Sequence, residues 1–322
     1  MLKLTSWFLL FIPLLGFSQI SKEETQTFYL DNGTAYTYKK PKLLEVIKYA
    51  PRDLAELGKF TLQKENLLWT SLTFGSTVAL IPFDQKLLEN AMELGEPIGW
   101  NKDATYDRLF GVLELFPRDI NAAVYFLGNG VTTLLIGGTF YSIGKINNDF
   151  RALNTANELV EILISTGLTT QILKRISGRQ SPSAAIESGN AGGHWTPFPS
   201  FKSFQTETPN YDAFPSGHVA TMMATITVIS TNYPDAKWVK PIGYSLMGLM
   251  AFEMMSARVH WISDYPLAIL IGYVIGKNAA NRRIDKNFKR DLTDEIIKPR
   301  FKTNFGFTFD SEFKMLKVTV VF

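Results

Sequence analysis

Six apolar segments of helical length constrain the fold of this chain more than any other feature. They occupy residues 67–83, 121–144, 159–173, 218–231, 242–257 and 265–276. Their length and apolar character predict helices. With 322 residues, of which 46% are hydrophobic and 20% charged, the chain can bury a substantial core. We therefore expect one large helical domain with extensions at its ends.

Charge and cysteine content exclude several classes of function. The formal net charge is only +3, and no stripe of Lys and Arg interleaved with stacking aromatic residues is present. A nucleic-acid partner is therefore not expected. The sequence contains no cysteine, so neither disulfides nor thiol chemistry can contribute.

The segment Pro215-Ser216-Gly217-His218 places a hydroxyl, a glycine and an imidazole at the start of an apolar helix. Glycine lets the backbone approach a ligand, and exposed N–H groups at a helix start favour an anion. The imidazole can move a proton near neutral pH. Phosphate is the obvious candidate ligand. A helix cap with a surface histidine explains the same four residues and stays open.

Two further clusters carry related chemistry. His260 and Asp264 stand four residues apart, so on a helix they share a face and the carboxylate can orient the imidazole as a nucleophile or base. Upstream, Lys174, Arg175 and Arg179 lie on either side of Gly178 at the end of an apolar segment, just before a proline. These cations can complement a helix C-terminus or clamp a phosphate.

In this order the clusters resemble the type 2 phosphatidic acid phosphatase family, which also includes bacterial acid phosphatases and vanadium haloperoxidases. The resemblance covers roughly residues 110–285. It implies an all-α fold, a bundle of about six core helices. Alternating segments predict short β elements near both termini, a hairpin at residues 26–38 and a strand within residues 305–322.

The family's first motif is Lys, six residues, then Arg-Pro, and the second is Pro-Ser-Gly-His. Residues 215–218 match the second motif completely. In the first, Lys174 and Pro182 match, but Ser181 stands at the arginine position. That arginine is a phosphate ligand in the family, and a point charge does not replace its planar fork.

The third motif is Ser-Arg, five residues, His, three residues, Asp. His260 and Asp264 match it, whereas Met254 stands at the arginine position and Glu253 at the serine position. The loss of both family arginines could weaken or abolish activity. Our hypothesis is that two nearby arginines supply these contacts, Arg179 beside the first gap and Arg258 one helical turn beyond the second.

The resemblance implies a phosphoryl transfer in two steps without a metal. His260 would form a phosphohistidine, Asp264 would orient the imidazole, and His218 would protonate the leaving oxygen. The implied phosphate contacts come from the following residues: Lys174, Ser216, Gly217 and, by our hypothesis, Arg179 and Arg258. We infer no metal, nucleotide or other cofactor, because the chain has neither a zinc ligand set nor a Walker loop.

The expected activity is therefore hydrolysis of a phosphomonoester or diphosphate, of a lipid if the helices span a membrane. Two alternatives stay open. A vanadate-dependent haloperoxidase would use the same pocket but relies on the missing arginines. A non-catalytic envelope protein would retain the fold and bind phosphate or lipid head groups weakly. The oligomeric state does not follow from the sequence.

Residues 1–19 combine a basic start, a short apolar run and a small-residue exit, which predicts a secretory signal peptide, and an uncleaved membrane anchor stays open as the alternative. We divide the rest into an N-terminal extension (20–65) with a hairpin and an amphipathic helix, the phosphatase domain (66–285) and a tail (286–322). Residues 121–144 are uncharged and long enough to cross a bilayer. The expected location is a bacterial inner membrane with a periplasm-facing site, or the periplasm in soluble form.

Overall fold

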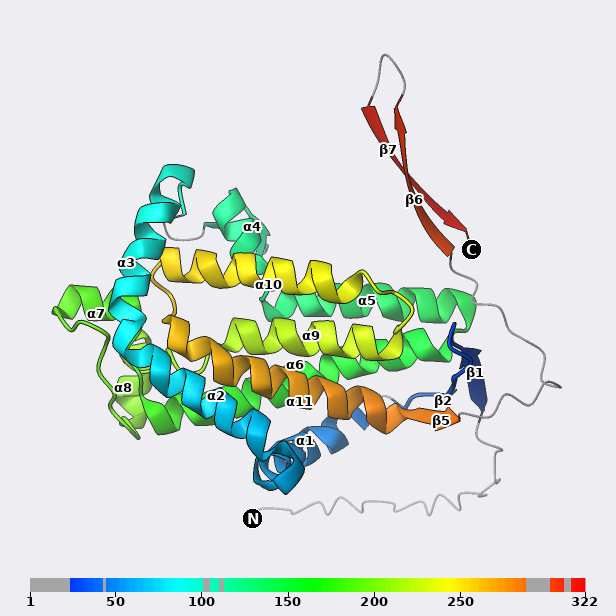
Figure 1. Ribbon diagram of the computed structural model, residues 1–322, viewed down its shortest axis with the longest axis horizontal. Coiled ribbons are helices and arrows are strands. Elements are labelled where there is room, and N and C mark those ends of the chain that lie inside the picture. Colours follow the sequence, from blue (N-terminus) through cyan, green and yellow to red (C-terminus); the bar gives the residue numbers. More distant parts are fainter. Residues whose placement is uncertain are drawn as a thin grey trace, which may run out of the picture.

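The computed structural model describes residues 24–42, 45–100, 105–109, 113–287, 302–309 and 314–321. Helices dominate this part of the chain, which confirms the predicted all-α class (Figure 1). The predicted signal peptide at residues 1–19 lies outside the described residues. The domain boundaries given above stay predictions.

Three helices form the centre of the bundle: α6 (Phe150–Ser177), α9 (Gly217–Asn232) and α11 (Tyr265–Arg283). Helix α5 (Gly130–Asn147) packs on α6, and α10 (Val239–Ser256) packs on α9 (Figure 1). Two glycines on one face of α11 allow its close approach to α9. A Cβ atom at Gly272 would lie 2.3 Å from the carbonyl oxygen of Ala220, and one at Gly276 would lie 2.7 Å from that of Ala224.

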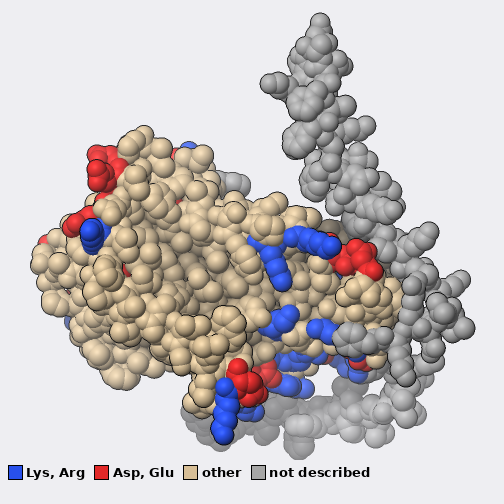
Figure 2. Space-filling view, viewed as in Figure 1, with Lys and Arg blue, Asp and Glu red and all other residues tan. Residues whose placement is uncertain are grey.

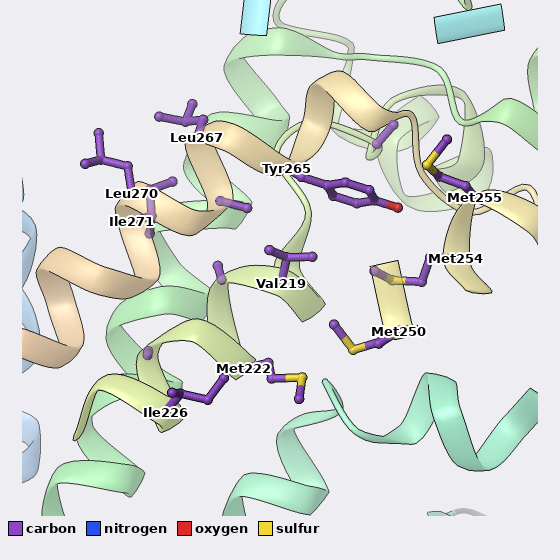
Figure 3. Packing of buried hydrophobic residues seen from close by; sticks show 14 of the residues in the cluster. Val219, Met222, Ile226, Met250, Met254, Met255, Tyr265, Leu267, Leu270 and Ile271 are labelled. Atoms are coloured by element: carbon purple, nitrogen blue, oxygen red, sulfur yellow. The ribbon is translucent and has the colours of Figure 1, made fainter. Parts of the chain in front are cut away.

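Methionines fill much of the core between α9 and α10. Figure 3 shows Met250 and Met254 beside Val219 and the ring of Tyr265. Both methionines are fully buried. Because the unbranched thioether adapts to irregular gaps, it suits a core in which helices of different orientation meet.

An N-terminal arm of three helices covers one side of this bundle. Helix α1 (Glu45–Leu62) packs on α6 and α11, α2 (Leu67–Leu80) packs on α11, and α3 (Asp84–Gly95) packs on α10. Figure 1 shows α2 and α3 crossing the front of the bundle. A single 3₁₀ turn, Ile81–Phe83, joins them, so the segment predicted as one helix leads into a second helix that the apolar pattern did not predict.

The segment predicted as one helix over residues 121–144 is two helices. Helix α4 (Ile120–Phe126) and α5 meet at an angle of 67°. The side chain of Asn129 accepts a hydrogen bond from the N–H of Val131 at 2.9 Å, which caps α5 and starts it anew. The prediction of one continuous helix was wrong because this polar cap interrupts the apolar run.

The strands lie at the ends of the chain and in one connection. The predicted N-terminal hairpin is present as β1 (Thr25–Tyr29) and β2 (Ala35–Lys39). Strand β2 also pairs antiparallel with β5 (Ile284–Asn287), which continues directly from α11. The C-terminal strand prediction corresponds to an antiparallel pair, β6 (Lys302–Phe309) and β7 (Lys314–Val321). A further pair joins β3 (Tyr106–Leu109) and β4 (Leu113–Pro117).

No single helix in the described ranges combines the length and the apolar composition that a bilayer crossing requires. The bent pair α4–α5 meets the criteria only when its two members are counted together. Figure 2 nevertheless shows a broad face of the bundle with almost no acidic or basic side chains. Basic side chains gather near the end where α11 meets β5, and acidic ones lie both near α3 and beside the basic ones.

Candidate active site

The first cluster lies where α6 ends and the chain turns sharply inward. Gly178 follows the helix with a φ of +54°, and a Cβ atom there would lie 1.8 Å from the carbonyl oxygen of Thr196. Both the backbone conformation and the space therefore require glycine. Lys174, in the last turn of α6, is buried, and its Nζ lies 3.5 Å from Asp212 Oδ2.

The second cluster opens α9, and its serine caps the helix. Ser216 Oγ accepts a hydrogen bond from the N–H of Val219 at 3.4 Å, so the cap interpretation of this residue holds. The Ser216 N–H also donates to the carbonyl oxygen of Asp264 at 3.2 Å. This bond joins the second cluster directly to the third. Ser216 is fully buried, so the cluster is an interior feature of the bundle.

His218 is half-buried and lies against an aromatic ring. The ring centroids of His218 and Tyr125 are 4.3 Å apart, and His218 Nε2 is buried without a hydrogen-bond partner. Burial is the largest cause that lowers the pKa of His218, to about 3. Repulsion from positive charge on His260 and Lys174 adds to the decrease. His218 is therefore half-buried with its Nε2 turned inward, and it is not a fully exposed surface histidine. The two imidazoles and the lysine lie close enough for their charges to interact.

His260 and Asp264 form the predicted pair, although not on an α-helix. Helix α10 ends at Ser256, and a 3₁₀ turn, Ile262–Asp264, carries the aspartate. His260 Nδ1 lies 3.2 Å from Asp264 Oδ2, which also accepts the N–H of Trp261 at 2.8 Å. A proton on Nδ1 would bond this carboxylate and leave Nε2 as the basic nitrogen. Both side chains are buried.

The structure gives Arg179 different partners from the predicted phosphate. Its Nη1 donates to Asp264 Oδ1 at 2.5 Å and to Ser263 Oγ at 2.6 Å, and its Nη2 donates to Asp84 Oδ2 at 2.5 Å. Arg179 is fully buried, and only its Nε lacks a hydrogen-bond partner. The predicted contact of its guanidinium fork with phosphate is therefore replaced by contacts with two carboxylates.

Arg258 lies beyond the end of α10 rather than on it. Its φ of +62° places it in the left-handed region, and its carbonyl oxygen accepts the N–H of Ser183 at 3.0 Å. The predicted relation of one helical turn to Met254 does not apply, because the helix has ended two residues earlier. The phosphate contact of Arg258 thus stays a prediction without that support.

The three residues that depart from the family motifs occupy a helix cap or buried positions in the bundle. Ser181 caps α7 (Pro182–Ser188) by accepting the N–H of Ala184 at 3.4 Å. Met254 is fully buried in the core. Glu253 is fully buried, neither carboxyl oxygen has a hydrogen-bond partner, and burial raises its pKa to about 8, with Asp119 adding to the rise.

An open groove of about 810 Å³ lies on the outer side of α6 near the first cluster. Leu168, Ile172 and Ile176 form one wall, and Phe201 and Phe204 of α8 (Phe201–Thr206) form the other. The groove is apolar and does not contain the imidazoles. Among the described residues, no group of three or more His, Cys, Asp or Glu side chains is placed to hold a metal ion.

Residues 155–286 match the family model of the PAP2 superfamily, and this segment contains all three clusters. This part of the chain is similar to the PAP2 superfamily. The match confirms the predicted family and supports an activity of the phosphatase or haloperoxidase type, on a phosphate-ester substrate in the phosphatase case. Neither a curated protein nor a solved structure matches the chain significantly.

Three residues of this candidate site were not predicted from the sequence. Asp84 and Ser263 contact Arg179, and Tyr125 packs against His218. Ser263 lies inside the third motif, next to Asp264, so its position was a usable signal. Asp84 and Tyr125 lie outside the matched segment, and only the tertiary structure brings them to the site.

Proposed function

We propose that this protein is a phosphatase that works through a phosphohistidine at His260. The observation that carries the proposal is the buried His260–Asp264 pair, 3.2 Å apart, with His218 and Lys174 in the same electrostatic cluster. His260 Nε2 attacks phosphorus while the bond to the alcohol oxygen breaks. Water then attacks phosphorus, and the P–N bond breaks to release phosphate and restore the imidazole.

His218 is assigned the proton transfers. With a pKa of about 3 it is neutral in the free protein, so it cannot serve as an acid before substrate binds. A phosphate group beside it adds negative charge and raises that pKa. His218 can then take the proton of a monoanionic phosphate ester and pass it to the leaving oxygen. In the second step it accepts a proton from the attacking water.

The phosphoryl oxygens are assigned to Lys174 and to the backbone N–H of Gly217 at the start of α9, where the helix end favours an anion. To reach phosphate, Lys174 exchanges its 3.5 Å contact with Asp212 for the more highly charged ligand. Arg258 stays a candidate third contact. The Ser216 hydroxyl already caps the helix, and the Arg179 fork already holds two carboxylates.

The apolar surface around the site supports a substrate with a lipid tail. The α6 stripe consists of five exposed residues spaced four apart: Val160, Ile164, Leu168, Ile172 and Ile176. Its last three members line the groove beside α8, on the outer side of the helix that carries Lys174. Each buried methylene of an acyl chain is worth about 0.8 kcal/mol, so such a surface favours a lipid phosphate over a small one.

The same uncharged surface supports association with a membrane, and we retain export to the bacterial envelope as part of the proposal. Fractionation with alkaline carbonate tests the membrane component. Recovery in the pellet supports an integral attachment. Recovery entirely in the supernatant contradicts it without affecting the proposed phosphatase activity.

Assays of phosphate release from p-nitrophenyl phosphate and from phosphatidic acid test the proposal. We expect both to be hydrolysed, the lipid with the higher kcat/KM, and neither by the His260→Ala variant. Halide oxidation with added vanadate would indicate the haloperoxidase alternative, which the commitment of Arg179 to carboxylates disfavours. Binding of phosphate without turnover would indicate the non-catalytic alternative.

A further inference from the structure

A residue outside the matched PAP2 segment bonds the groups that surround the aspartate partner of His260. Asp84 is the first residue of α3, and its side chain is fully buried. Its Oδ1 accepts the N–H of Ser263 at 3.1 Å, and its Oδ2 accepts the Ser263 hydroxyl at 2.6 Å and Arg179 Nη2 at 2.5 Å. Burial raises the pKa of Asp84 and Arg179 opposes the rise, while all three hydrogen bonds require acceptor oxygens.

Arg179 is held firmly between this carboxylate and that of Asp264. It bridges Asp84 Oδ2 and Asp264 Oδ1, both at 2.5 Å. The rings of Trp195 and Trp261 lie 4.6 Å and 5.5 Å from its guanidinium carbon. A planar guanidinium with both ends bonded and aromatic rings beside it has little freedom to rotate.

The two oxygens of Asp264 consequently have separate tasks. Oδ1 receives Arg179, and Oδ2 receives the N–H of Trp261 and faces His260 Nδ1. Because a carboxylate is planar, fixing Oδ1 also fixes the direction in which Oδ2 meets the imidazole.

We propose that Asp84 and Arg179 are positioning residues that orient Asp264, so that His260 keeps its proton on Nδ1 and leaves Nε2 free to react. The effect of this positioning on the reaction rate rests on the proposed function, whereas its effect on the imidazole tautomer does not. The arm helix α3 is, on this account, part of the site although it lies outside the PAP2 match.

The Asp84→Asn variant tests this role with little change in shape. The amide oxygen can still accept from Ser263, but Arg179 loses its second carboxylate and is free to shift on Asp264. We expect kcat to fall about 10- to 100-fold, by analogy with groups that orient metal ligands through a hydrogen bond, and KM to change less than about threefold. The matched control is Glu93→Gln, an exposed acid on the same helix, which should leave both constants unchanged.

The imidazole nitrogens give a readout that does not depend on turnover. The chain has only three histidines, so a protein labelled with ¹⁵N in histidine gives few signals, and His260→Gln identifies those of His260. We expect wild-type His260 to be protonated at Nδ1, and Asp84→Asn and Ser263→Ala to populate the Nε2-protonated form as well. Ser263→Ala leaves every charge in place and provides a second variant should Asp84→Asn fail to fold.

Protonation of His260 at Nε2 in the wild type would overturn the inference. An unchanged tautomer and unchanged kcat in either folded variant would also overturn it. A tautomer shift in a protein whose wild type releases no phosphate would support the positioning role while contradicting the proposed function.

Discussion

Two buried ion networks tie the N-terminal arm to the bundle, and they differ in what they hold. At one end Asp84 of α3 reaches Asp264 through Arg179. At the other end Asp53 of α1 pairs with Arg282 at 2.5 Å, and Arg282 pairs with Glu161 of α6 at 2.7 Å. Both networks consist of carboxylates and guanidinium groups in the interior.

Only the first network borders imidazoles. His260 accepts its orientation from Asp264, and His218 Nε2 faces no protein partner. In the second network, Arg283 also pairs with Glu161, and Ser165 donates to Asp53 at 2.6 Å. No histidine takes part there. A buried ion pair by itself therefore indicates only that helices are held together. A candidate site needs, in addition, an adjacent nucleophile whose reactive nitrogen is free of protein partners.

The largest expected effect separates the two networks by activity. His260→Ala removes the nucleophile, and we expect kcat for phosphate release to fall at least about 10³-fold. The free energy of unfolding should change far less than it does for a disrupted ion pair. The variant loses an imidazole, but Asp264 keeps its ion pair with Arg179, so no buried charge is left without a partner. Steady-state assays and urea unfolding measure the two quantities, and retained turnover would remove His260 from the mechanism.

The next effect appears at the second network and concerns stability. Arg282→Met leaves Asp53 and Glu161 buried without their shared partner. Removing one member of a buried pair costs about 3–5 kcal/mol of unfolding free energy. Chemical denaturation measures this loss, while kcat per folded molecule should be unchanged. A large loss of kcat in the folded variant would show that this network also serves the site.

A smaller effect distinguishes the two imidazoles. His218→Gln removes the proposed proton donor, which is worth about 10²-fold or more for an alkyl phosphate. A p-nitrophenolate leaving group needs little protonation, so its release should slow much less. Comparing the two substrates on one enzyme preparation gives the ratio directly. Equal losses for both substrates would contradict the assignment of His218 as the acid.

The smallest effect concerns a buried acid outside both networks. Burial raises the pKa of Glu253 from 4.5 to about 8, so between these values the folded protein holds a proton that the unfolded chain has lost. Stability therefore falls as pH rises through this window, by on the order of 1 kcal/mol per pH unit. Glu253→Gln should flatten that dependence. An identical pH profile of Tm in the variant would show that the pH dependence of stability comes from groups other than Glu253.

The helices of the bundle and the chemistry of the three clusters were predictable, because apolar runs and compact motifs are local in sequence. The break between α4 and α5 was not predicted, since one asparagine cap decides it within an otherwise apolar run. The pairing of β2 with β5 was also out of reach, because it joins residues about 250 positions apart and no local pattern encodes it.

Within the site, the residue types were predictable but the direction of long side chains was not. Arg179 stands two residues from the family position. Nothing in the neighbouring sequence reveals that its guanidinium bonds to Asp84, 95 residues earlier. The left-handed conformation of Arg258 likewise depends on how α10 ends. Partners far away in the sequence therefore decide whether a nearby cation can replace a missing phosphate ligand.

Detection of the phosphoenzyme tests the central claim most directly. The protein is mixed with a substrate labelled with ³²P in its phosphoryl group and quenched in alkali within milliseconds, since phosphohistidine survives alkali and is lost in acid. We predict a label that maps to the peptide containing His260, disappears in His260→Ala, and persists longer in variants slow in the second step. Phosphate release without any labelled enzyme at the earliest times, or a label on another residue, would contradict the account.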